Sequence, residues 1–164
     1  MEVEESAVRI SDDVELSVRR WAGTGRLPFL LVHGLSSNAR LWDEVAGALA
    51  GAGHPSYAVD LRCHGESSCP ADGHDTGTAA ADLAALTTAL GLDRVVVAGQ
   101  SWGGDVAVRF AAEHPGMVAA LALVDGGWVD LPATFDTWTA CAAALRPPDL
   151  DGLHVDKLRR ELAL

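Results

Sequence analysis

Short apolar runs alternate with helical patterns along this chain, and this alternation constrains the fold more than any other feature. Continuous apolar strands are typical of a parallel sheet that is buried on both faces. Strands separated by helices require right-handed crossovers, so the pattern predicts an α/β fold with a mostly parallel sheet and helices on both faces. The runs cover residues 29–32, 57–59, 95–98 and 121–124.

The start of the chain follows a different rhythm, in which apolar and polar residues alternate. Val14, Leu16 and Val18 are apolar and the residues between them are polar, which is typical of a half-buried strand. The polar segment 11–13 predicts a turn from a shorter strand over residues 7–10. The chain is therefore expected to begin with an antiparallel hairpin.

Three segments have the spacing of amphipathic helices. One helix is predicted from Trp102 to His114. The other two each end before a glycine, which is typical of a helix C-terminus. Their predicted buried faces consist of Leu41, Val45, Ala48 and Leu49 in the first and of Leu83, Leu86 and Leu90 in the second.

Length and charge narrow the classes of protein and partner. A chain of 164 residues, 49% hydrophobic and 21% charged, predicts one globular core. The 12 basic and 23 acidic residues give a net charge of −11, which argues against nucleic acid and membranes as partners. Because there is neither a bilayer-spanning apolar run nor a secretory signal, we expect a cytoplasmic protein.

The cysteines indicate the redox state that we expect. Cys63, Cys69 and Cys141 are an odd number in a chain without a signal, which favours reduced thiols over a disulfide framework. Cys63, His64, Cys69 and His74 have spacings that match no common zinc finger. No metal or cofactor is therefore predicted.

The segment Gly99-Gln100-Ser101-Trp102-Gly103 lies between a predicted strand and a predicted helix. A sharp strand-to-helix turn forces its central residue into a strained backbone conformation, so small residues are needed two positions before and after it. The turn holds the serine oxygen at the carboxyl end of the sheet, beside the positive end of the helix dipole. This context predicts that Ser101 is a nucleophile.

The sequence resembles the α/β-hydrolase family over roughly residues 14–127. The resemblance rests on the turn at Ser101, called the elbow below, and on segments 33–35 (His-Gly-Leu) and 60–67 (Asp-Leu-Arg-Cys-His-Gly-Glu-Ser). The resemblance implies an esterase-like serine hydrolase with Ser101 as nucleophile. It also implies that the backbone N–H groups of Leu35 and Trp102 form the oxyanion hole. The residues that would shape and brace the surrounding loops are His33, Gly34, Asp60, Arg62, His64, Gly65, Gly99 and Gly103. Cys63 stands where the family usually has glycine.

In the family, the catalytic residues follow one another along the chain as nucleophile, acid and histidine, and this sequence has no residue that matches the histidine. Only one buried run follows Ser101, so the resemblance implies an N-terminal portion that lacks the final strands and the catalytic histidine. Asp125 ends that run and is the candidate acid, with a loop-bracing carboxylate as the alternative. Residues 1–127 are expected to form the hydrolase core and residues 128–164 the start of a helical cap.

None of the histidines in the sequence is a convincing general base. His33 and His64 are expected to brace loops, and His114 to complement a helix dipole. The other three, His54, His74 and His154, are expected on the solvated surface. In the cap, Trp128, Phe135 and Trp138 either line an acyl pocket or pack the cap onto the sheet.

These features predict hydrolysis of a carboxylic ester or similar acyl bond in a small-molecule substrate, through an acyl-enzyme at Ser101. The alternative is a non-catalytic small-molecule binding protein, or pseudo-enzyme, of the same fold. Haloperoxidases and carbon–carbon bond hydrolases of the family stay open, whereas its epoxide and haloalkane hydrolases use an aspartate nucleophile. Without further strands, residues 118–124 would form an open apolar edge, which predicts self-association.

Overall fold

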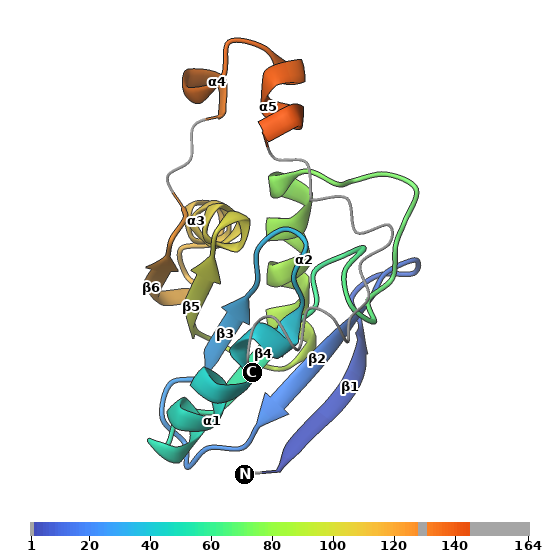
Figure 1. Cartoon of the computed structure of the whole chain (residues 1–164). Coiled ribbons are helices and arrows are strands. Elements are labelled where there is room, and N and C mark those ends of the chain that lie inside the picture. The colour runs from blue at the N-terminus through green and yellow to red at the C-terminus, as the bar shows by residue number, and fades with distance from the viewer. Residues whose placement is uncertain (1, 128–130, 145–164) are drawn as a thin grey trace, which may run out of the picture. The chain divides into compact units, whose positions relative to one another are not determined.

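Six strands form one sheet in the order β1-β2-β4-β3-β5-β6 (Figure 1). The computed structural model describes residues 2–127 and 131–144. β3, β4, β5 and β6 run parallel, whereas β1 pairs with β2, and β2 with β4, in antiparallel fashion. The α/β class and the initial hairpin are thereby confirmed. The strands are β1 (Val3–Arg9), β2 (Glu15–Trp21), β3 (Phe29–Val32), β4 (Ser56–Val59), β5 (Val95–Gln100) and β6 (Val118–Val124).

Strand β1 begins earlier than the predicted residues 7–10, and charge pairing explains the difference. Glu4 lies opposite Arg20 and Glu5 lies opposite Arg19 in the register of β1 and β2. The Arg20 guanidinium is 2.8 Å from a Glu4 carboxylate oxygen, and Arg19 also pairs with Glu5. Opposite charges that face each other across two strands stabilise the pairing. An acidic segment without apolar alternation therefore still forms a strand.

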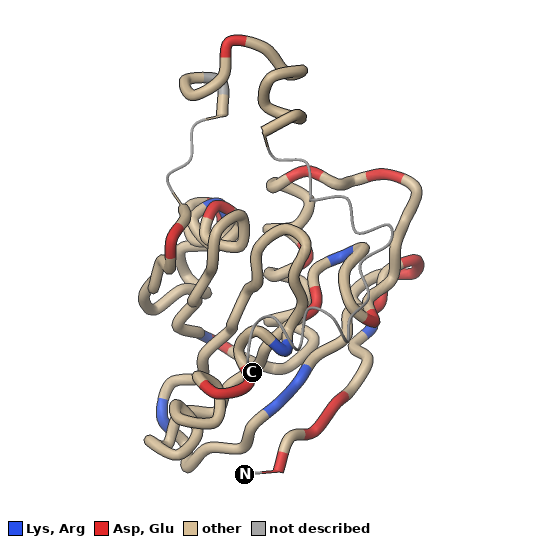
Figure 2. Tube along the Cα trace, viewed as in Figure 1, with Lys and Arg blue, Asp and Glu red and all other residues tan. Residues whose placement is uncertain are grey.

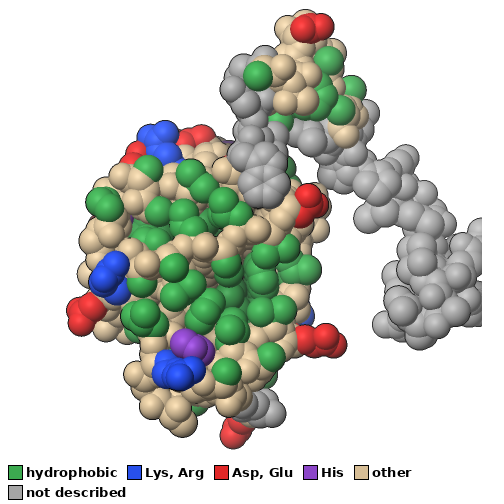
Figure 3. All heavy atoms as spheres, turned by 90° about the vertical axis from the view of Figure 1, so that its left-hand side faces the viewer, with side chains coloured by type: hydrophobic (Ala, Val, Ile, Leu, Met, Phe, Trp, Pro, Cys, Tyr) green, Lys and Arg blue, Asp and Glu red, His purple; other side chains and the backbone are tan. Residues whose placement is uncertain are grey.

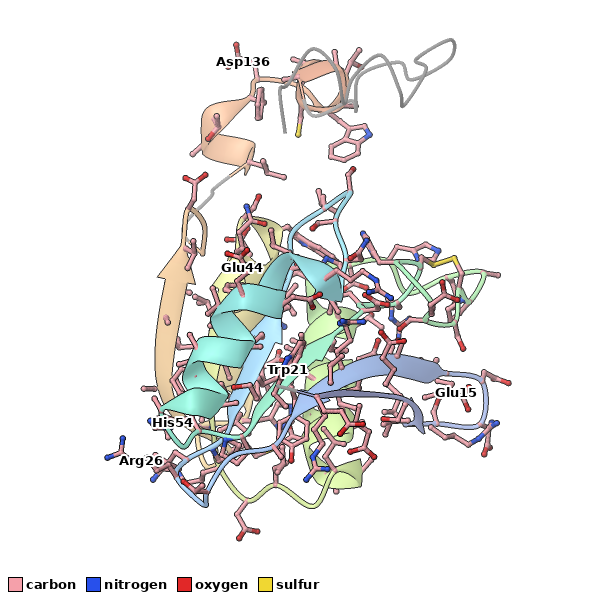
Figure 4. The ribbon with its side chains drawn as sticks, turned by 60° about the horizontal axis from the view of Figure 1, so that its bottom comes forward. Glu15, Trp21, Arg26, Glu44, His54 and Asp136 are labelled. Carbon is pink, nitrogen blue, oxygen red and sulfur yellow. A yellow bond between two sulfur atoms is a disulfide. The ribbon has the colours of Figure 1, made fainter. Side chains whose placement is uncertain are left out.

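Helices cover both faces of the sheet, as predicted (Figure 1). On one face, the short helix η1 (Ala39–Trp42) and α1 (Asp43–Gly51) pack against Leu31 and Ala58. Figure 4 shows Trp21 of β2, which belongs to the same cluster, beside α1. On the other face, α2 (Thr76–Ala89) and α3 (Trp102–Glu113) pack against a larger cluster from the strands. The sheet is thus the middle of three layers.

The predicted buried face of the first helix is wrong except for Leu49, which packs against the core cluster. Leu41 and Val45 are 49% and 45% exposed, whereas the buried residues are Trp42, Ala46 and Ala50. These three lie four residues apart and so share one helix face. The small side chains of the two alanines permit a close approach of the helix to the sheet, and Trp42 belongs to the same buried cluster. The prediction gave most weight to large aliphatic residues, and the one alanine that it included, Ala48, is exposed.

The other two predicted helices agree with the structure. Leu83 and Leu86 of α2 are fully buried, and Leu90 packs against the same cluster just beyond the helix. The third helix begins at Trp102 and ends at Glu113, one residue before the predicted end.

A disulfide joins Cys63 and Cys69 in the loop between β4 and α2 (Figure 4), so the expectation of reduced thiols is wrong for this pair. The loop turns back on itself, and the Cys63 N–H donates to the Ser68 carbonyl over 3.0 Å. This turn brings two cysteines that are six residues apart into bonding distance. Cys141 is free and buried. The number of cysteines gave no information about this local geometry.

A second unit follows the sheet. The chain divides into units 1–129 and 130–164, two residues after the predicted core boundary. Within the second unit the structure describes the helices α4 (Leu131–Thr134) and α5 (Trp138–Ala144). Its predicted role as the start of a cap stays a prediction. Trp128 and His154 lie outside the described residues.

Strand β6 stands at the end of the strand order among the described residues. Leu121, Leu123 and Val124 on this strand are 39%, 37% and 46% exposed. Figure 3 shows hydrophobic side chains gathered on the side of the molecule that carries β6. The predicted open apolar edge is thus present in the part of the chain that the structure describes. No described helix is both long and apolar enough to cross a membrane.

Candidate active site

The parallel strands end together and place the predicted functional loops along one edge of the sheet. β3 pairs in register with both β4 and β5 up to Val32, and β5 pairs with β6 up to Gln100. Ligands of open α/β sheets bind at this carboxyl edge. The residues that follow the four strand ends are His33, Asp60, Ser101 and Asp125.

Ser101 occupies a strained turn between β5 and α3. Its backbone has φ 51° and ψ −125°, a combination that costs a non-glycine residue about 1–3 kcal/mol. A Cβ atom on Gly99 would lie 2.2 Å from the Gly103 carbonyl oxygen, and one on Gly103 would lie 2.4 Å from the His33 carbonyl oxygen. Both approaches are too close for non-bonded atoms. The glycines therefore permit the tight turn that the sequence predicts around Ser101.

The end of β6 presses against this turn. The Ser101 N–H donates to the Val124 carbonyl over 3.0 Å. A Cβ atom on Gly126 would lie 2.1 Å from the Ser101 carbonyl oxygen, so this backbone passes directly beside the turn. Asp125, which lies between Val124 and Gly126 in the sequence, is exposed and has a positive φ of 50°. The structure brings Asp125 close to the elbow, and its role as the acid stays a prediction.

Two backbone segments lie beside Ser101 where oxyanion donors are predicted. Trp102 is the first residue of α3, and the first N–H groups of a helix have no partner within the helix. A Cβ atom on Gly34 would lie 2.9 Å from the Ser101 Cβ atom. The loop that carries Leu35 therefore lies directly against the elbow. The Leu35 side chain is 53% exposed. The predicted role in the oxyanion hole belongs to the backbone N–H of Leu35 and does not involve this side chain.

His33 is fixed by two hydrogen bonds to the backbone. Its ring is fully buried, and Nδ1 lies 2.7 Å from the Gly34 carbonyl oxygen. The Leu61 N–H donates to Nε2 over 3.1 Å, which assigns the proton to Nδ1. Burial lowers the pKa of His33. A neutral imidazole with both nitrogens engaged holds the β3 loop against the β4 loop and is not available as a base.

The buried Asp60 carboxylate also connects the segment after β3 with the loop after β4. One carboxylate oxygen accepts from the Ala39 N–H over 2.6 Å, and the other accepts from the Glu66 N–H over 3.0 Å. Buried carboxylates need such donors. A Cβ atom on Gly65 would lie 2.0 Å from the Asp60 carboxylate, so the loop can close around Asp60 only with glycine there. The bracing role that the resemblance implies fits these contacts.

A buried ion pair fixes the β4 loop to helix α2. The Arg62 guanidinium donates two hydrogen bonds to Asp82, of 2.6 and 2.7 Å. Both side chains are more than nine-tenths buried. The hydrogen bonds from Arg62 to Asp82 raise the pKa of Arg62. A two-pronged pair of this kind restricts the direction of both side chains, so the loop has a rigid support.

His64 and Trp102 lie together beside the elbow. The His64 ring is stacked on the Trp102 ring at a centroid distance of 6.2 Å and lies 4.9 Å from the His33 ring. Nδ1 of His64 is 2.8 Å from the Arg62 carbonyl oxygen. The Trp102 indole N–H donates to the Thr76 hydroxyl over 3.0 Å. The side chain of the first residue of α3 thus contacts one residue of the β4 loop, His64, and the first residue of α2, Thr76.

The remaining described histidines have local partners. His54 lies 2.9 Å from the Leu27 carbonyl oxygen through Nδ1, and its ring packs against Phe29 at the start of β3, the end opposite Ser101. His114, the residue directly after α3, packs against Phe110 of that helix. His74 Nδ1 is 3.7 Å from the Cys63 sulfur. His74 is exposed, as predicted, whereas His54 and His114 are partly buried.

The second unit contains an apolar cavity of its own, of about 460 Å³. It is lined by Leu131, Phe135, Asp136, Thr137, Trp138 and Cys141. Two of the three aromatic residues that the sequence singles out therefore line a cavity. Trp138 is 76% exposed, so packing on its own helix does not bury it.

Sequence reasoning missed two residues of this region, Asp82 and Thr76. Asp82 could have been found, because it lies on the apolar face of α2 beside Leu83 and Leu86, and a carboxylate in that position needs a cationic partner. Thr76 carries no such signal. Its contact with Trp102 depends on how two helices that are distant in the sequence pack together.

Comparisons with known proteins agree with this geometry. The sequence profile of the alpha/beta hydrolase fold matches residues 28–160. The chain is 39% identical over 118 residues to a non-heme chloroperoxidase of Streptomyces lividans, covering 71% of this chain and 43% of the relative. It is 38% identical over 112 residues to the lipase LipV of Mycobacterium tuberculosis, covering 68% of this chain and 42% of the relative.

A solved structure gives the same result in three dimensions. The epoxide hydrolase CorEH superposes with a TM-score of 0.71 at 31% identity, over 80% of this chain and 48% of that one. The chain thus spans less than half the length of these relatives. Its sheet order, the strained strand-to-helix turn at Ser101 and these matches lead to one conclusion: the chain belongs to the alpha/beta hydrolase fold family.

Proposed function

We propose that this chain carries the nucleophile and oxyanion hole of a serine hydrolase that acts on carboxylic esters or similar acyl bonds. The observation that carries the proposal is Ser101 in a strained turn at the start of α3, with φ 51°. An elbow of this kind exposes the hydroxyl where a substrate can reach it. A serine at this position favours acyl transfer over the epoxide chemistry named for one relative.

The proposed reaction begins with attack of the Ser101 oxygen on the carbonyl carbon of the ester. As the new carbon–oxygen bond forms, the carbonyl electron pair moves to the oxygen, which becomes an oxyanion. The backbone N–H groups of Trp102 and Leu35 donate to this oxyanion, and the dipole of α3 lowers its energy further. Water takes the proton of Ser101, and collapse of the intermediate breaks the bond to the leaving alkoxide, which gains a proton from solvent and departs as the alcohol. The acyl group that remains on Ser101 is then attacked by water, which releases the carboxylic acid and restores the Ser101 hydroxyl.

The proton of Ser101 needs a base, and the proposal places none among the described residues. His33 uses both ring nitrogens on the backbone. Asp125 lies beside the elbow and would orient a histidine rather than replace one. The proposal therefore predicts slow acylation by this chain alone, because an unassisted hydroxyl is a poor nucleophile at neutral pH.

The engaged nitrogens of His33 also favour a second candidate function, which is binding without turnover. A pocket that retains the fold and lacks a base would still hold small apolar ligands. Such ligands would raise the melting temperature of the chain without being consumed. Hydrolysis that disappears in Ser101→Ala would exclude this second function.

A fluorophosphonate probe tests the first proposal, because it forms a covalent bond with an activated serine. We expect slow incorporation of one phosphonate per chain, located at Ser101 by peptide mass spectrometry. The Ser101→Ala variant should take up none. Ser6→Ala, which removes an exposed serine of β1, is the matched control and should be labelled like the wild type. Equal labelling of wild type and Ser101→Ala would overturn the assignment.

A further inference from the structure

The side chain of Trp102 is held at both its edge and its face. Its indole N–H donates to the hydroxyl of Thr76, the first residue of α2, over 3.0 Å. The His64 ring stacks against the indole with an interplanar angle of 30°. Trp102 is half-buried, and a buried indole N–H needs an acceptor to balance its lost hydration. Both contacts come from outside α3.

Each of the two contacts rests on a fixed support. His64 follows Arg62, which is locked to Asp82, and its Nδ1 is held by the Arg62 carbonyl. Thr76 follows Asp75, which caps α2 by accepting from the Thr78 N–H over 3.0 Å. Neither support can shift without breaking buried or capping hydrogen bonds. The position of the indole is therefore determined by the β4 loop and by α2.

The His64 ring also connects Trp102 to the loop that carries Leu35, the second proposed oxyanion donor. His64 also touches the ring of His33 at 4.9 Å. His33 in turn holds the Gly34 carbonyl through Nδ1, directly before Leu35. A continuous series of packed rings thus connects the two backbone segments whose N–H groups would bind the oxyanion.

We propose that Thr76 is a positioning residue of the oxyanion hole that acts through Trp102, with the His64 ring as a second contact of the indole. This inference rests on the proposed function, because it gives the Trp102 N–H the role of a donor. Oxyanion donors act only within a few tenths of an ångström of the required position. Loss of the Thr76 hydrogen bond lets the indole rotate, and the first turn of α3 moves with it. The effect falls on the chemical step and leaves the binding of the probe unchanged.

The test compares Thr76→Val, which removes the acceptor at nearly constant volume, with Thr76→Ser, which retains it. The readout is fluorophosphonate labelling, resolved into a saturation constant and a maximal rate. We expect the maximal rate to fall about tenfold in Thr76→Val with an unchanged saturation constant, and to stay within about twofold of wild type in Thr76→Ser. Thr88→Val, near the other end of the same helix, is the matched control: the Thr88 hydroxyl bonds only to the Ala84 carbonyl within α2, so this variant should keep the wild-type rate.

A second readout does not depend on chemistry. In ¹⁵N NMR spectra, the indole N–H signal of Trp102 should exchange with solvent faster in Thr76→Val than in wild type or Thr76→Ser. Trp102→Phe removes the same hydrogen bond from the other partner and should lower the maximal rate equally, which guards against misfolding of Thr76→Val. If Ser101 is labelled at the same maximal rate in all variants, this inference is wrong. If Ser101 is not labelled even in the wild type, the proposed function fails and this inference with it.

Discussion

At the scale of single residues, only glycine at position 103 lets the start of α3 lie this close to the backbone at the end of β3. A Cβ atom there would lie 2.4 Å from the His33 carbonyl oxygen and 2.5 Å from that of Val32. Both neighbours are backbone atoms of a central strand, which cannot move without disturbing the sheet. The packing of the turn at Ser101 therefore depends on this glycine.

We predict that Gly103→Ala lowers the free energy of unfolding by about 3 kcal/mol, because overpacking in a rigid core costs that much. Gly47→Ala is the control. It lies within α1 with nothing within 4 Å of the added atom, so it should stabilise by about 0.5–1 kcal/mol. Urea denaturation measures both values. Equal stability of the two variants would contradict the close packing at the elbow.

The sequence was informative at this scale wherever a residue type has few alternative explanations. Ser101 between two glycines, after an apolar run, predicts its strained turn because little else fits that pattern. The roles of Asp82 and Thr76 depend on partners 20 and 26 residues away in the chain. Local spacing contains no information about such partners. The assignments of Asp125, Leu35 and Trp102 stay predictions.

At the scale of elements, the strands were easier to predict than the helix faces. A strand buried on both sides needs a continuous apolar run, so its limits appear directly in the sequence. Helix α1 buries Ala46 and Ala50 and exposes Val45, and the preceding η1 exposes Leu41. Which side of a helix faces the sheet depends on the space available, and a hydrophobicity pattern does not measure that space.

The loop between β4 and α2 combines a disulfide with a residue in an unfavourable conformation. Cys63 has a positive φ of 60°, in the position where the family usually has glycine. Left-handed backbone costs a residue with a Cβ atom about 1–2 kcal/mol. The bond to Cys69, six residues further on, offsets this cost because it limits the unfolded chain.

We predict that Cys63→Ser combined with Cys69→Ser lowers the free energy of unfolding by about 2 kcal/mol, as the entropy of closing so short a loop suggests. Dithiothreitol should lower the melting temperature of wild type to the same extent and leave the double variant unchanged. A melting temperature that responds to reductant equally in both proteins would show that the pair does not stabilise the fold.

At the scale of the whole molecule, charge and apolar surface act in opposite directions. The net charge of −11 repels a second copy of the chain, and Figure 2 shows the acidic residues spread over strands, helices and loops. The exposed side chains of β6 attract a second copy, because an unpaired strand edge with apolar residues is a template for pairing (Figure 3). Which effect dominates depends on ionic strength.

We therefore predict that the chain self-associates through β6 and that salt strengthens the association. Raising the ionic strength from about 0.01 to 1 M shortens the screening length from about 30 to 3 Å, which weakens the repulsion and leaves the apolar contact. Sedimentation velocity at several concentrations should show dimers or larger species at high salt.

The variant Leu121→Lys with Leu123→Lys locates the contact, because it places two charges on one face of β6. It should remain monomeric under conditions in which wild type associates. Val45→Lys, which replaces an equally exposed residue of α1, should associate like the wild type. A monomeric wild type at every salt and concentration would mean that the −11 charge or the strand's own twist protects this edge. Association that persists in the β6 variant would place the contact on another surface.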